Sequence, residues 1–169
     1  MTTMTTQRPL GNPLTFEHLV QINDATDTRV TSLTRSQLWQ GLILRATEPE
    51  GFIPWLDTSE IQGDIEQGMQ RCLNYGSYQI RDEVHFTANE QVEYQSYDAT
   101  TGGEFILRMK IEEPNPDALF VRFIYQAHSV DHHADSPLGY AIKEAYRFSD
   151  DDLIMRIRLL AESGNLDVQ

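Results

Sequence analysis

Alternating apolar and polar residues run through most of the chain, and this period of two is typical of β-strands. In LTFEHLVQIN, residues 14–23, one face of the predicted strand carries Phe16, Val20 and Ile22. Six more strands are predicted near 59–66, 68–74, 78–86, 91–97, 103–113 and 118–128. The turns between them are short and marked by Gly, Asn and Pro, so the six should form an antiparallel meander.

Two segments before the meander depart from the strand pattern. The first has the spacing of an amphipathic helix, and the second is too short for a full helix. TRSQLWQGLILRAT, residues 34–47, has an apolar face that includes Leu38 and Leu42, and Thr34 or Ser36 can cap its first turn. EGFIPWL, residues 50–56, predicts a short second helical turn or a hairpin, because its proline prevents a long helix.

The tail, residues 136–166, predicts a long terminal helix. Ser149 and Asp152 resemble a capping box, which predicts a kink or short break near 149–150. The predicted apolar face, with Asp152 as its one polar interruption, consists of Leu138, Ala141, Ala145, Phe148, Met155 and Leu159.

This order of elements predicts an α+β domain in two layers. A curved seven-stranded antiparallel sheet should wrap around the long C-terminal helix, with two short helices after strand 1. The helix has to cover the concave face of the sheet, and the space between them suits a ligand pocket. Residues 1–13 are threonine-rich without periodicity, so we expect a flexible leader before a single ligand-binding domain at 14–166.

Composition narrows the classes of partner. With 26 acidic and 13 basic residues the net charge is −13, which repels phosphate backbones and argues against a nucleic-acid partner. No apolar run is long enough for membrane insertion, and the N-terminus lacks the apolar core of a secretory signal, so we expect a cytoplasmic protein. Cys72 is the single cysteine, which excludes an intramolecular disulfide. The oligomeric state is left open, a homodimer included.

Motifs for cofactor chemistry are absent from the sequence. There is no GxSxG, and no glycine-rich loop fits a phosphate, so no cofactor is expected. The one metal-like cluster lacks the i, i+4 spacing of helical zinc motifs, so we expect a solvated loop and no metal site there. Its members are His128, Asp131, His132, His133 and Asp135.

Arg122 interrupts the most apolar strand, FVRFIYQAH at 120–128. Alternation places it opposite Phe123 and Tyr125, but both faces of this strand are apolar. Facing outward, Arg122 would pair with a carboxylate such as Glu112 or Glu113. Facing inward, it would be a buried charge that awaits an anionic group. Both orientations stay open, and Arg122 is included among the candidate ligand-binding residues.

Other candidates sit on the faces predicted to line the pocket. His18 is the candidate catalytic acid or base, given a carboxylate to orient one ring nitrogen and an open pocket beside the other. Tyrosines suit a cavity wall, because the ring is apolar and the hydroxyl can hold one polar ligand atom. Tyr125 and Tyr146 are predicted to face each other across the pocket. The candidate ligand-binding set is His18, Tyr94, Arg122, Phe123, Tyr125 and Tyr146.

Several segments carry a family resemblance that spans nearly the whole chain. They are LTFEHLVQIND at 14–24, LTRSQLWQGLILRATEPEGFIP at 33–54, IEEP at 111–114, LFVRFIY at 119–125, AY at 145–146 and IR at 157–158. In this order they resemble the helix-grip fold of the SRPBCC superfamily, which includes START lipid-transfer domains, birch-pollen-allergen-like proteins and polyketide cyclases. More narrowly, the chain resembles the AtaL-like family.

The resemblance implies a cavity that in relatives holds apolar or amphipathic molecules, but no single activity, since this scaffold hosts several. We therefore expect a protein that binds a lipid-like or polyketide-like small molecule. The alternative is a cyclase or hydratase that uses His18 or a tyrosine on a polyketide-like substrate. A third hypothesis is an interaction module whose cavity is filled by side chains.

Overall fold

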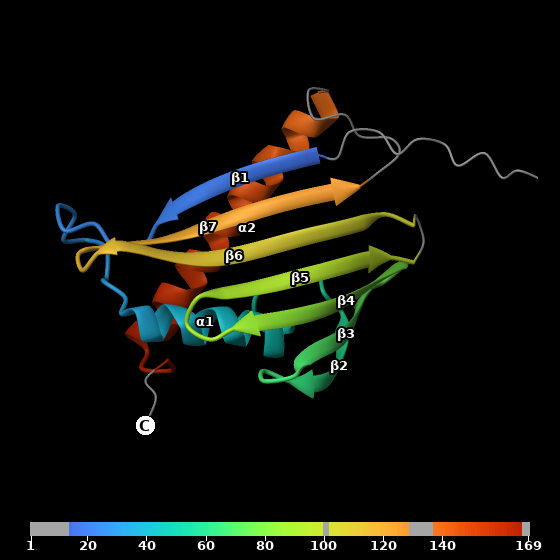
Figure 1. The fold of residues 1–169 in the computed structure, drawn as a ribbon, viewed down its shortest axis with the longest axis horizontal. Helices are drawn as coiled ribbons and strands as arrows, with labels where there is room; N and C mark the ends of the chain where they lie inside the picture. The colour runs from blue at the N-terminus through green and yellow to red at the C-terminus, as the bar shows by residue number, and fades with distance from the viewer. Residues whose placement is uncertain (1–13, 100–101, 129–136, 167–169) are drawn as a thin grey trace, which may run out of the picture.

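The computed structural model describes residues 14–99, 102–128 and 137–166 (Figure 1). The expected leader, 1–13, and most of the histidine-containing loop lie outside these residues. The elements are β1 (Leu14–Gln21), α1 (Arg35–Thr47), a 3-10 turn η1 (Pro49–Gly51), β2 (Thr58–Asp64), β3 (Gly68–Tyr75), β4 (Tyr78–Thr87), β5 (Gln91–Asp98), β6 (Glu104–Asn115), β7 (Ala118–His128) and α2 (Pro137–Glu162).

The seven strands form one antiparallel sheet in the order β1-β7-β6-β5-β4-β3-β2. The predicted meander is confirmed, and each predicted strand matches an observed one to within two residues at either end. Figure 1 shows the curved sheet with α1 and α2 on one face, so the expected α+β helix-grip architecture is confirmed. The second short helix is reduced to the single turn η1, because Pro54 follows closely.

Helix α1 begins where the sequence predicts. The Thr34 hydroxyl accepts a hydrogen bond from the Gln37 amide, and the Gln37 side chain accepts from the Thr34 amide, which completes a capping box. Leu38, Trp39 and Leu42 then enter the core. The helix ends at Thr47, two residues before Pro49.

The core lies between the helices and one face of the sheet, here called the inner face. Alternate residues of each strand point into it, and those between them point to the outer face. Val84, Val92, Met109 and Phe123 are almost completely buried there. The buried side of α2 supplies Leu153, Ile154 and Ile157.

The predicted apolar face of α2 is wrong, and so is the predicted break. The helix is continuous from 137 to 162, and Phe148, Met155 and Leu159 are 71%, 50% and 57% exposed. Asp152 instead pairs with Arg156 one turn later, at 2.7 Å. Two sides of this helix carry apolar residues at helical spacing, and the one with Leu153, Ile154 and Ile157 packs on the sheet. Spacing alone does not choose between two such faces.

Candidate functional site

A cavity of about 740 Å³ lies between the inner face of the sheet and α2. Strands β3 to β7 form its wall, the last turn of α1 contributes Arg45, and the first half of α2 covers it. Much of the lining is apolar, with a few polar groups between. The apolar and aromatic side chains are Ile53, Leu73, Tyr75, Tyr78, Ile80, Tyr94, Phe105, Leu107, Ala127, Ile142, Ala145 and Tyr146.

Strand register orders these residues along the cavity. Tyr75 and Tyr78 pair at the β3–β4 hairpin, and their rings stack with centroids 5.1 Å apart. Two residues further in, Leu73 pairs with Ile80, which pairs with Asp98. Deeper along β5 lie Ser96 and then Tyr94. At ~3.3 Å per residue, Asp98 and Tyr94 are about 13 Å apart along the strand.

A buried ion pair crosses β3 and β4 beside the cavity. Arg71 Nε and Nη2 donate to the two carboxylate oxygens of Asp82 at 2.7 and 2.5 Å, and Arg71 Nη1 donates to the Ala46 carbonyl at 3.0 Å. Both side chains are 2% exposed. Each nitrogen of this guanidinium therefore donates a hydrogen bond within the protein, and its charge is balanced.

Arg45 and Arg71 both lie near the ring of Tyr94, but they differ in whether a carboxylate balances their charge. The guanidinium carbon of Arg45 is 4.7 Å from the centroid of Tyr94, and that of Arg71 is 5.0 Å away. In the described part of the chain, Arg45 makes no ion pair with a carboxylate. The Tyr94 side chain is buried, and its hydroxyl has no hydrogen-bond partner among the described residues. The prediction that Tyr94 lines the cavity agrees with its position.

Tyr125 and Tyr146 meet, but not across open space. Their rings stack face to face with centroids 4.1 Å apart and planes 6° from parallel. Phe105 contacts both rings, at centroid distances of 5.8 and 5.9 Å. Tyr146 and Phe105 line the cavity, whereas Tyr125 lies behind them. The predicted pair therefore closes one side of the cavity.

His18 belongs to a buried network behind this wall. Its Nδ1 lies 3.1 Å from Asp150 Oδ2, and the Tyr125 hydroxyl donates to Asp150 Oδ1. Burial raises the pKa of Asp150 to about 6, although hydrogen bonds from Tyr125 and His18 oppose the shift. Burial and the charge of Asp150 raise the pKa of Tyr125 and bring that of Tyr146 to about 12, so both stay protonated.

The carboxylate expected beside His18 is therefore present, but the open pocket beside its ring is not. His18 is not among the residues that line the cavity. Phe123 is completely buried and packs in the core rather than on the cavity wall. These two candidates support the wall from behind.

Arg122 lies on the outer face, so its candidacy for this cavity is corrected. Its Nε donates to Glu112 at 3.0 Å, and its Nη1 to Glu17 at 3.2 Å. Hydrogen bonding to Glu112 is the main cause that raises the pKa of Arg122. Both faces of β7 carry apolar residues, so alternation alone does not place Arg122. Pairing of β7 with β1 and β6 brings Glu17 and Glu112 beside it.

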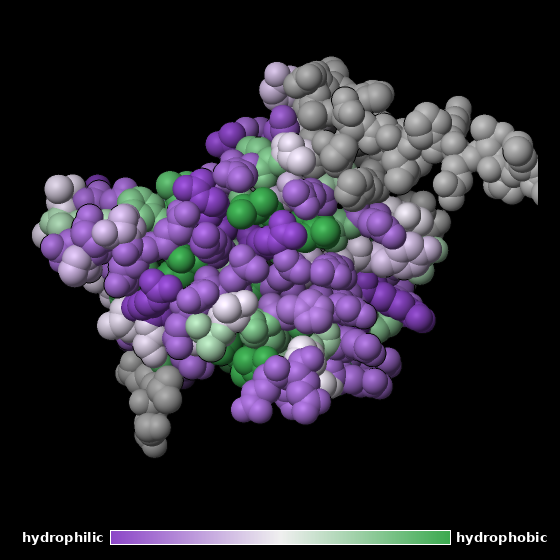
Figure 2. Space-filling model, in the orientation of Figure 1, coloured by the Kyte–Doolittle hydropathy of each residue, from purple (hydrophilic) through white to green (hydrophobic). Residues whose placement is uncertain are grey.

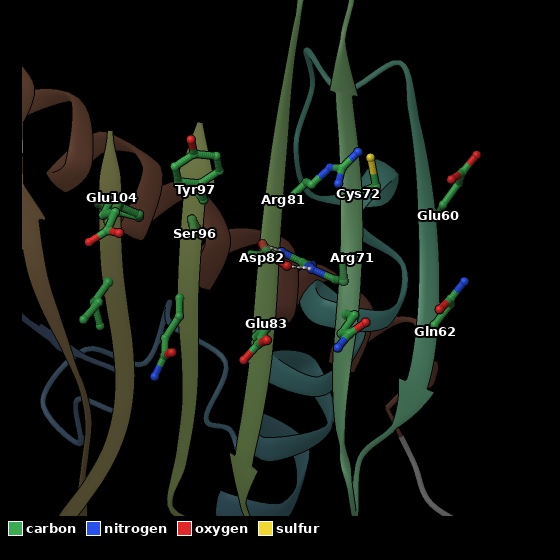
Figure 3. Close-up of a pocket in the computed structure, with 14 residues that line it drawn as sticks. Glu60, Gln62, Arg71, Cys72, Arg81, Asp82, Glu83, Ser96, Tyr97 and Glu104 are labelled. Atoms are coloured by element: carbon green, nitrogen blue, oxygen red, sulfur yellow. Dashed lines mark hydrogen bonds and ion pairs between the residues drawn. The ribbon is translucent and has the colours of Figure 1, made fainter. Parts of the chain in front are cut away.

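The outer face also carries a groove of about 790 Å³, drawn in Figure 3. A row across the strands passes from Glu60 through Cys72, Arg81 and Tyr97 to Glu104, and Figure 3 shows these side chains in front of the sheet. Figure 2 shows that this face is mostly hydrophilic. Because its polar groups are open to water, the groove offers a ligand little gain on binding. The inner cavity is the better candidate site.

Sequence reasoning missed Arg45, Asp82 and Asp150. The sequence does carry a signal for Asp82, which lies between Ile80 and Val84 on the apolar face of β4. Arg71 lies on the apolar face of β3, so two opposite charges are both predicted to point inward. Asp150 follows Tyr146 by one turn of α2, and choosing the wrong face of that helix concealed it. Only the packing of α1 on the sheet reveals Arg45.

Over 14–99, 102–128 and 137–166, no group of three His, Cys, Asp or Glu side chains is placed to hold a metal ion. The predicted loop cluster lies outside the described residues except for His128, the last residue of β7. None of the described helices has both the length and the apolar character needed to cross a membrane.

The sequence matches one protein family over most of its length. The family model AtaL, described as acetylaranotin biosynthesis cluster protein L, matches residues 18–164. The chain belongs to the AtaL family. No curated protein gives a significant match to this AtaL-family chain.

Solved structures with the same fold are remote in sequence. The di-domain ARO/CYC StfQ from the steffimycin biosynthetic pathway is 10% identical with a TM-score of 0.65, covering 90% of this chain and 51% of that one. The Zhui aromatase/cyclase from Streptomyces sp. R1128 is 10% identical with a TM-score of 0.63, covering 89% and 96%. Ara h 8.0201 is 12% identical with a TM-score of 0.62, covering 90% and 99%. At these identities the likeness establishes the fold alone.

Proposed function

We propose that this AtaL-family protein binds an apolar or amphipathic small molecule, lipid-like or polyketide-like, between its sheet and α2. The cavity of about 740 Å³ carries this proposal. Small-molecule sites typically enclose roughly 300–1,000 Å³ and are lined by apolar and aromatic groups with few polar ones. The same volume argues against an interaction module whose cavity is filled by side chains.

Burial of apolar surface supplies the binding energy in this proposal. Leu73, Ile80 and Phe105 are among the apolar residues that line the cavity. Each 100 Å² of ligand surface moved from water onto such a wall gains roughly 2.5 kcal/mol. A cavity without catalytic groups can therefore retain an apolar molecule. Proteins of this fold include an aromatase/cyclase, which supports the proposal by analogy of fold only.

Cyclase-type or hydratase-type catalysis on a polyketide-like substrate is the second candidate. Asp150 favours it, because a buried carboxyl with a pKa near 6 is typical of functional sites. Tyr146 lines the cavity, and its hydroxyl, with a raised pKa, can donate a hydrogen bond but is a poor base at neutral pH. His18 and Asp150 have no direct access to the cavity, so binding is preferred.

A titration with N-phenyl-1-naphthylamine, a neutral fluorescent probe, tests the proposal. We expect binding, and we expect Ser96→Phe to weaken it at least tenfold, because Ser96 lines the cavity on the inner face of β5. Gln95→Phe is the matched control, since it adds the same ring to the outer face. Equal effects of the two variants would contradict the proposal. Native mass spectrometry of protein from its own host should reveal a retained apolar molecule.

A further inference from the structure

Tyr94 lines the inner end of the cavity and has a buried hydroxyl. The residue is 2% exposed, lines the cavity, and its hydroxyl has no hydrogen-bond partner among the described residues. Buried polar groups are nearly always hydrogen-bonded, and an unsatisfied one costs about 1–3 kcal/mol. A hydroxyl in this state therefore indicates a position where a ligand atom completes the bonding.

Arg45 supplies a positive charge at the same place. Its guanidinium lies over the Tyr94 ring, with the guanidinium carbon 4.7 Å from the ring centroid. The two side chains interact, but no hydrogen bond of normal geometry satisfies the Tyr94 hydroxyl. Because Asp82 neutralises Arg71, the inner end keeps one net positive charge from these three side chains.

The opposite end of the cavity carries negative charge. Asp98 lines it at the end of β5, about 13 Å from Tyr94 along the strand. Phe105 and Ser96, which pair across β5 and β6, lie between the two ends, and Leu73 and Ile80 line the wall at the level of Asp98. An anionic group is therefore repelled at the Asp98 end and attracted at the Arg45 end, and this polarity would orient an elongated ligand.

We infer that Arg45 and Tyr94 form the binding site for the anionic head of an otherwise apolar ligand, in the simplest case one terminal carboxylate. A guanidinium matches a carboxylate with two parallel hydrogen bonds, and the Tyr94 hydroxyl can donate a third. The inference rests on the proposed function, because it names the class of molecule that the cavity accepts.

A pair of fluorescent probes separates the head group from the apolar body. 1-Anilinonaphthalene-8-sulfonate is anionic, its sulfonate standing in for a carboxylate, and N-phenyl-1-naphthylamine has the same rings without the charge. Hydrogen bonds to charged groups contribute ~1.5–3 kcal/mol, so Arg45→Gln should weaken the anionic probe about 10- to 100-fold. The neutral probe should change less than about threefold. Arg45→Lys should restore part of the loss.

Tyr94→Phe and Arg81→Gln complete the test. Tyr94→Phe removes only the hydroxyl and should weaken the anionic probe about 3- to 10-fold, and it carries the test if Arg45→Gln does not fold. Arg81→Gln removes the same charge from the exposed outer face of β4 and should leave both probes unchanged. Thermal unfolding checks that each variant is folded.

Two outcomes would overturn the inference in different ways. If the neutral probe binds and Ser96→Phe blocks it, but neither Arg45→Gln nor Tyr94→Phe affects the anionic probe selectively, the anionic subsite is wrong and the cavity proposal stands. If the neutral probe does not bind, or binds with no sensitivity to Ser96→Phe, the proposed function fails and the subsite fails with it.

Discussion

Asp82→Ala should be among the most destabilising single substitutions in this protein. It leaves the Arg71 guanidinium buried without its carboxylate, next to the positive charge of Arg45. Removing one partner of a buried ion pair typically costs 3–5 kcal/mol. Domains of this size are stable by only about 5–15 kcal/mol, so the variant should lose a large share of its free energy of unfolding.

Replacing both partners should be much milder. Arg71→Met with Asp82→Leu removes both charges together and keeps similar volume, and such exchanges are often neutral or stabilising. Here the Ala46 carbonyl also loses its donor, so we expect a net change within about 2 kcal/mol of the original protein.

Urea unfolding measures these differences. Trp39 is buried in the core and reports unfolding by fluorescence, while circular dichroism gives an independent probe. The double-mutant cycle should give a coupling energy above about 2 kcal/mol. A coupling near zero, or a cost below about 1 kcal/mol for Asp82→Ala alone, would refute the reasoning, because it would mean that the two charges are solvated and unpaired.

Three further predictions concern α2 and its contacts. Burial raises the pKa of Asp150 from 3.8 to about 6, so its contribution favours folding most below pH 4 and is lost as the pH rises through 6. Asp150→Asn should flatten that decline by up to about 3 kcal/mol, at ~1.36 kcal/mol per pKa unit, and an unchanged pH profile of urea unfolding would contradict this. Gly41→Ala should cost about 1–3 kcal/mol, because its Cβ would lie 2.6 Å from Ile157 Cγ2; an unchanged melting temperature would argue against the helix contact. Ile157→Ala should cost about 2–5 kcal/mol and Phe148→Ser less than about 0.5, and the reverse order in urea unfolding would mean that the other face of α2 is buried.

The surroundings of Tyr94 and His18 depend on contacts between segments that lie far apart in the sequence. The predicted role of Tyr94 in the cavity wall agrees with its position because alternation along β5 is enough to turn it inward. Its closest charged neighbour, Arg45, comes from a helix about fifty residues earlier in the chain. His18 was placed on the correct face of β1, but α2 brings Asp150 against it and the Tyr125–Tyr146 stack stands between it and the cavity.

The sequence by itself determined the strands, their antiparallel order, the cap of α1 and the presence of a long terminal helix. These features follow from local properties, since side-chain period, turn residues and capping groups act over a few residues. Tertiary structure decided which face of α2 is buried, where Arg122 points, and which charges are balanced. Those outcomes depend on which groups a distant element brings near, because Glu17 and Glu112 hold Arg122 outside, while Arg45 meets an unsatisfied hydroxyl inside.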